Sequence, residues 1–99
     1  MDTKRLEVAL ADEFGGDASE RRVIARQARD LADSGKSDDD RGHSLSVSEI
    51  VRQLSDAPDD SSVIERWNWW MGALDTAYGG YGRFAVRVVS DDGGADVNR

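Results

Sequence analysis

The side chains that could carry acid–base, metal or nucleophilic chemistry are few and poorly grouped. There is no cysteine, and His43 is the single histidine. Asp38, Asp40 and Glu49 have the spacing of positions 1, 3 and 12 of a calcium-binding EF-hand loop. The match fails because His43 stands at position 6, where the tight turn needs the glycine that this chain has one residue earlier, at Gly42. The sequence therefore predicts no metal site, no cofactor and no catalytic residue, with His43 as a solvated loop side chain.

The paired carboxylates and the glycine-rich segment make no better case for an enzyme. The aspartate pairs fall in predicted loops or near the C-terminus, at 39–40, 59–60 and 91–92, where a solvated surface is expected. The glycine-rich run 78–82 joins a helix to an extended segment, whereas phosphate-binding loops run from a strand into a helix. We therefore expect a non-enzymatic protein with no small-molecule substrate.

Composition limits the size of the fold and suggests a cell type. Ninety-nine residues with 38% apolar content allow one domain with one modest core. The net charge of −7 comes from fifteen Asp and five Glu against eleven Arg and two Lys, a skew typical of salt-in halophilic proteomes. No apolar run approaches the roughly 18 residues that cross a membrane. Together with the lack of cysteine, these features predict a soluble cytoplasmic protein that does not enter membranes.

Helical periodicity and helix caps predict four helices. We expect them at 2–14, between Asp17 and Gly35, at 46–55 and at 62–77. The last three each begin with the spacing of a capping box, in which two side chains satisfy free backbone N–H groups of the first turn. The three pairs are Asp17 with Glu20, Ser46 with Glu49, and Ser62 with Glu65. Residues 36–44 are polar and are predicted to form a loop.

The segment 83–89 has the pattern of a strand with one solvated face. Phe84, Val86 and Val88 alternate with Arg83, Ala85 and Arg87. A strand needs a partner for its backbone groups, which leaves open a short pairing near 43–45 or pairing with a second copy. Residues 90–99 lack apolar periodicity and are predicted to be a disordered acidic tail. The fold class we expect is α+β and mainly α: one globular domain over residues 1–89, with a helix-turn-helix-like pair and one C-terminal strand or hairpin.

The order of elements over residues 18–89 resembles a winged helix-turn-helix domain in outline. The resemblance implies that the helix at 62–77 reads DNA bases through Arg66 and Asn68. It also implies that Arg83 and Arg87 on the strand hold the phosphate backbone. A DNA-binding transcriptional regulator is therefore the alternative function.

Three tryptophans within four residues are the most distinctive feature of the chain. On a helix, the side chains that share one apolar face are Val63, Trp67, Trp70 and Leu74. Trp69 lies about 200° around the helix from Trp67, off that face. Either the N-terminal helix covers Trp69, which is the simpler interpretation, or Trp69 forms a contact surface. Gly72 is costly inside a helix, which predicts a backbone or a ring passing close to it.

We therefore expect a small interaction or regulatory module of a halophile-type proteome that acts through protein contacts. Self-association and a separate protein partner are both open, and nucleic acid belongs to the alternative. The expected contact residues are Arg66, Trp69, Tyr78 and Tyr81.

Overall fold

The computed structural model describes residues 1–87, and within them every regular element is a helix. The expected tail at 90–99 and the end of the predicted strand, at 88 and 89, lie outside the described residues. The elements are α1 (Thr3–Phe14), α2 (Ala18–Ser34), α3 (Lys36–Arg41), α4 (Val47–Ser55), α5 (Val63–Tyr78) and the 3₁₀ turn η1 (Gly82–Phe84). None of these helices has the length and apolar composition needed to span a bilayer.

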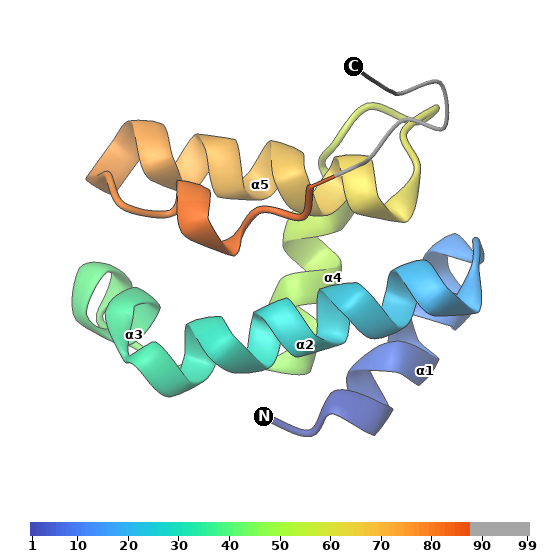
Figure 1. The fold of residues 1–99 in the computed structure, drawn as a ribbon, viewed down its shortest axis with the longest axis horizontal. Coiled ribbons are helices and arrows are strands. Elements are labelled where there is room, and N and C mark those ends of the chain that lie inside the picture. Colours follow the sequence, from blue (N-terminus) through green and yellow to red (C-terminus); the bar gives the residue numbers. More distant parts are fainter. Residues whose placement is uncertain (88–99) are drawn as a thin grey trace, which may run out of the picture.

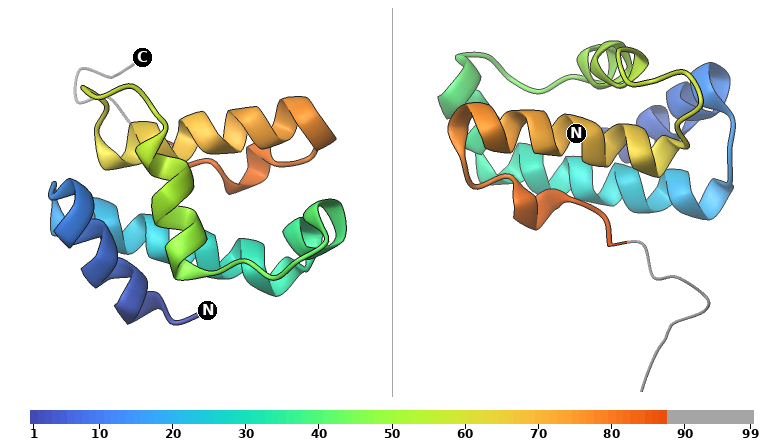
Figure 2. Two further views of the ribbon diagram at one scale, coloured as in Figure 1. Left: turned by 180° about the vertical axis from the view of Figure 1, so that it is seen from behind. Right: turned by 90° about the horizontal axis from the view of Figure 1, so that it is seen from above.

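α5, α2 and α1 follow one another from top to bottom of the view in Figure 1, and α4 lies behind α2 and α5. α1 packs along α2, and α5 runs beside α2 on the side away from α1, as the two further views show (Figure 2). α4 crosses behind this pair and contacts both α1 and α5. The turn η1 packs on α2 and α5 together, so the chain after α5 folds back between these two helices.

One apolar core joins all the long helices. α1 and α2 contribute mainly leucine, isoleucine and alanine side chains, and α5 contributes two of the three tryptophans. The fully or almost fully buried apolar side chains of the long helices are Leu6, Leu10, Ile24, Ala25, Ala28, Leu31, Ile50, Leu54, Val63, Trp67, Trp70, Met71 and Leu74. Within each helix, the buried residues are mostly three or four positions apart, so they form one stripe along the helix. Burial of this stripe confirms the helical periodicity seen in the sequence.

The three predicted capping boxes differ in how far they form. Only the box of α5 is complete, because Ser62 N–H donates to Glu65 Oε1 over 2.7 Å and Glu65 N–H donates to Ser62 Oγ over 3.1 Å. At α4, Ser46 caps the helix, but the carboxylate of Glu49 turns to Arg41 and His43 instead. An ion pair is the stronger contact at this buried site, so it takes the carboxylate from the cap.

The cap of α2 uses a single side chain. Asp17 accepts hydrogen bonds from the backbone N–H of Ser19, over 2.8 Å, and from its hydroxyl, over 2.9 Å. The box would have required the amide of Glu20 instead. These two bonds hold the pKa of the Asp17 carboxyl below its usual value.

The prediction of a loop over residues 36–44 is wrong in its first part, where the chain forms α3. This helix has no apolar face, so hydrophobic periodicity cannot reveal it. Lys36 and Asp40 pair across one turn at 3.2 Å, and Asp38 and Asp39 lie in the first turn, where carboxylates favour a helix.

The predicted α+β class with a winged-helix outline is wrong, because the described residues contain no strand. Residues 82–84 form η1, and 85–87 run on without a partner strand. The alternating pattern has another cause: Phe84 and Val86 are both buried between helices. The backbone groups that a second strand would have paired are satisfied by side chains of α5.

Candidate protein-interaction site on α5

The tryptophans of α5 point to different sides of the helix because successive residues differ by about 100°. Trp67 is fully buried and Trp70 is 3% exposed, with their rings edge to face at 5.7 Å. Trp69 is 41% exposed. The interpretation in which the N-terminal helix covers Trp69 is therefore wrong, since α1 packs its apolar face on α2 and α4.

From Trp69 towards the C-terminus, the outer face of α5 carries no charge over two turns, while Glu65 lies exposed one turn before Trp69. Its exposed residues there are Trp69, Gly72, Ala73 and Thr76. A Cβ atom added at Gly72 would meet nothing within 4 Å, so the expected close neighbour is not within the described chain. We call these four residues the outer face, and it presents a large indole beside small residues.

The opposite flank of the same segment holds the chain that follows α5. Trp67 Nε1–H donates to the carbonyl oxygen of Phe84 over 2.8 Å. Asn68 donates from Nδ2 to the carbonyl oxygen of Val86 over 2.9 Å, and Asn68 Oδ1 accepts from the N–H of Val86 over 2.7 Å. One amide side chain therefore makes both bonds that a strand residue would make. We call Trp67 and Asn68 the clamp.

Arg66, expected both as a contact residue and as a DNA contact, holds the fold together instead. Its guanidinium donates to the carbonyl oxygens of Leu54 over 3.0 Å and of Asp59 over 3.1 Å. It also lies over the ring of Phe14 at 4.8 Å. The Leu54 carbonyl belongs to the last turn of α4, where the regular helical hydrogen bonds end, and it also accepts from the N–H of Ala57 over 3.3 Å. Arg66 thus helps to close the turn between α4 and α5.

Tyr81 is also internal. It is fully buried, its hydroxyl donates to Asp40 Oδ2 over 2.9 Å, and Lys36 Nζ lies 4.7 Å from its ring. Burial and the neighbouring carboxylate raise the pKa of Tyr81, while the hydrogen bond from Tyr81 lowers the pKa of Asp40. This contact ties α3 to the chain after α5, and it leaves no surface for a partner at Tyr81.

Tyr78 is 48% exposed, but it does not extend the outer face. It lies nine residues after Trp69, which places it about 180° around the helix. Its ring lies 6.2 Å from that of Tyr81. Of the four expected contact residues, the structure therefore exposes Trp69 and Tyr78, on different sides of α5.

Of the four residues expected to contact DNA, two are bound within the fold and two are exposed. Asn68 and Arg66 have their polar atoms committed within the fold. Arg83 is exposed and lies over the ring of Phe84 at 4.7 Å, and Arg87 is exposed at the end of the described chain. The wing on which the last two were expected is not present in residues 1–87.

Sequence reasoning missed a buried ionic cluster at the start of α4. Glu49 is 7% exposed and pairs with Arg41, and both of its carboxylate oxygens lie 3.1 Å from His43 Nε2. Arg41 in turn lies over the ring of Trp70 at 5.7 Å. The capping-box spacing hid this role, because it assigned the Glu49 carboxylate to the helix cap. The cluster anchors the loop before α4 to the core.

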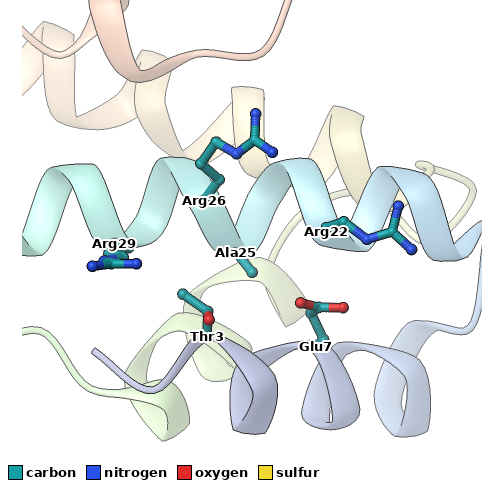
Figure 3. Close-up of a pocket in the computed structure, with 6 residues that line it drawn as sticks. All are labelled: Thr3, Glu7, Arg22, Ala25, Arg26 and Arg29. Carbon is teal, nitrogen blue, oxygen red and sulfur yellow. The ribbon is translucent and has the colours of Figure 1, made fainter.

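A hollow of about 140 Å³ lies between α1 and α2. It is lined by Thr3, Glu7, Arg22, Ala25, Arg26 and Arg29. Figure 3 shows the arginines spread along α2, with Arg26 pointing away from Thr3 and Glu7. The described residues contain no group of three metal-ligating side chains, either here or elsewhere.

Comparison with known proteins places this arrangement in a family. No curated protein and no solved structure matches the chain. A family model described as the WNWW domain matches residues 1–75, three quarters of the sequence. That name spells the residues from Trp67 to Trp70, which form the clamp, part of the core and the exposed indole described above. The chain belongs to the WNWW domain family.

Proposed function

We propose that this domain is a non-enzymatic interaction module that acts through protein contacts, with the outer face of α5 as its contact surface. The observation that carries the proposal is the 41% exposed indole of Trp69 on an otherwise well-anchored helix. Tryptophan is the residue type most enriched at interface hot spots, where it supplies large contact area at little entropic cost.

The surroundings of Trp69 favour a second copy of the chain as the partner. In a chain with 33% charged residues, the outer face is uncharged between Trp69 and Thr76. A single helix thus offers both a projecting ring and the small residues Gly72 and Ala73. Two copies related by a twofold axis can each place Trp69 over the other's Gly72, because an isologous interface requires such self-complementarity.

Charge elsewhere on the chain makes this association dependent on salt. Two copies with a net charge of −7 each repel one another in dilute buffer. At molar salt the Debye length falls to about 3 Å, so the repulsion is screened while apolar contact persists. The Asp-rich and Arg-rich composition suggests a salt-rich cytoplasm, and a salt-dependent dimer fits that setting. We therefore include a cytoplasmic location in a halophile-type cell in the proposal.

Size-exclusion chromatography with light scattering in molar KCl tests the proposal. We expect a dimer for the wild type and a folded monomer for Trp69→Ala. Val8→Ala is the matched control, because Val8 is 56% exposed on α1, away from the outer face, and this variant should stay dimeric. A monomeric wild type, or a Trp69→Ala variant that remains dimeric, would show that the outer face does not join two copies.

A further inference from the structure

The segment after Tyr81 lies in a groove between α2 and α5, and every second side chain of residues 84–87 is buried there. Phe84 and Val86 are 6% and 9% exposed and belong to the core, whereas Arg83 and Arg87 are exposed. Polar contacts come from the clamp and reach only backbone atoms of the segment: the carbonyl oxygens of Phe84 and Val86 and the N–H of Val86. The segment is thus held by its main chain and by two alternate apolar side chains.

This is the chemistry of peptide recognition by strand-like addition, in which main-chain bonds give affinity and pockets for alternate side chains give specificity. Phe84 ends the 3₁₀ turn η1 and the chain is extended at Ala85. Other peptides can present backbone atoms in the same conformation, so the clamp does not require this particular segment. Because Phe84 and Val86 are the buried side chains, a peptide that replaces this segment must carry an aromatic and a β-branched residue two positions apart.

The segment can leave without disturbing α1 to α5, and only the single 3₁₀ turn η1 within it would unfold. α5 ends at Tyr78, and the chain is anchored again at Tyr81, whose N–H donates to Asp75 Oδ1 over 2.9 Å and whose hydroxyl binds Asp40. Gly82 follows directly, with open space at its Cα atom. Residues 82–87 therefore form an arm that starts after the contacts of Tyr81 and is held only by the groove and the clamp.

We propose that the groove between α2 and α5, with the Trp67–Asn68 clamp at its edge, is a binding site for a peptide of a partner protein that enters as a single turn and continues extended. The ligand carries an aromatic and a β-branched residue two positions apart, and residues 84–86 occupy the site in cis. The site differs from the outer face, since Asn68 and Trp69 point about 100° apart on α5.

The cis segment competes with any ligand because its tether gives it an effective concentration on the order of millimolar. Wild-type protein should therefore bind a separate peptide weakly. A variant that carries Phe84→Gly and Val86→Gly loses the two apolar anchors while the clamp stays intact, so its groove becomes available.

Fluorescence anisotropy with a labelled peptide of residues 82–87 tests this in the full chain. We expect the released double variant to bind at least ten-fold more tightly than the wild type. Adding Asn68→Ala to the released variant should weaken binding at least ten-fold, and a peptide with glycine at both apolar positions should not bind. A released variant that keeps its helical circular dichroism and binds no better than the wild type overturns the proposal, as does binding that Asn68→Ala leaves unchanged.

A second measurement on the wild type covers the case in which the released variant does not fold. Unlabelled peptide is added to ¹⁵N-labelled wild-type chain at concentrations up to the order of millimolar, to compete with the tethered segment. We expect the amide signals of Phe84 and Val86 to move towards disordered positions while the indole N–H signal of Trp67 keeps its folded shift. Unchanged signals at the highest peptide concentration would overturn the proposal.

Discussion

Replacing Asn68 with alanine removes the two hydrogen bonds that hold Val86, and its effect can be worked out from the structure. The bonds measure 2.7 and 2.9 Å, and each contributes about 1 kcal/mol net. Alanine is the better helix former by up to roughly 0.7 kcal/mol, which offsets part of this loss. Asn68→Ala should therefore lower the free energy of unfolding by about 1 to 2 kcal/mol.

Urea unfolding in molar KCl, followed by circular dichroism, measures this difference. The matched control is Thr76→Ala, which brings a similar helix-propensity gain on the same helix but removes only a bond to the carbonyl oxygen of Gly72, within the helix itself. Because Thr76 lies on the outer face, both variants are compared at protein concentrations where the chain is monomeric. Amide exchange at Val86 should also speed up in Asn68→Ala, because that N–H loses its acceptor. If Asn68→Ala is as stable as Thr76→Ala, the clamp does not hold the chain as described.

Three further substitutions test separate contacts. Gly72→Ala should raise stability by about 1 kcal/mol, because the added Cβ meets nothing within 4 Å; a loss of stability in urea unfolding of the monomer would contradict this. Ser37→Ala should raise the melting temperature, because the Ser37 hydroxyl is buried without a hydrogen-bond partner among residues 1–87 and alanine removes that desolvation cost of about 1 to 3 kcal/mol; an unchanged or lower temperature counts against it. The lowered pKa of Asp40 stabilises the fold above its ordinary value of 3.8, and this contribution is lost as the pH falls through the lowered pKa. Tyr81→Phe removes the main cause of the shift, so melting temperatures measured between pH 6 and pH 2, endpoints of about the usual acid-unfolding range, should fall less steeply for this variant than for the wild type.

The long helices could be predicted from the sequence because their signals are local. Apolar residues recur at helical spacing, and Ser or Asp stands at each start from α2 onwards except at α3. The same arithmetic of about 100° per residue predicted that Trp69 leaves the core face. α3 was missed because its stability comes from charge pairs and from Tyr81, forty-one residues away from Asp40.

The C-terminal segment shows why the rest could not be predicted. Alternation of Phe84 and Val86 correctly indicates that one side of the segment is buried, but it does not identify what pairs with the backbone. A second strand is the usual partner, and here the partner is the side chain of Asn68. The hydrogen bonds of Arg66 could not be predicted for a similar reason, since its acceptors lie on the preceding helix and turn.

The central claim is that the four residues from Trp67 to Trp70 divide into side chains that hold the fold and one, Trp69, that is left for contacts. Urea unfolding of Trp67→Ala and Trp69→Ala, at protein concentrations where both are monomeric, tests it most directly. Loss of the fully buried Trp67 should cost about 3 to 5 kcal/mol, and loss of Trp69 should cost less than about 1 kcal/mol. An equal loss of unfolding free energy in the two variants would contradict this division, because it would show that Trp69 stabilises the fold as much as a core residue does.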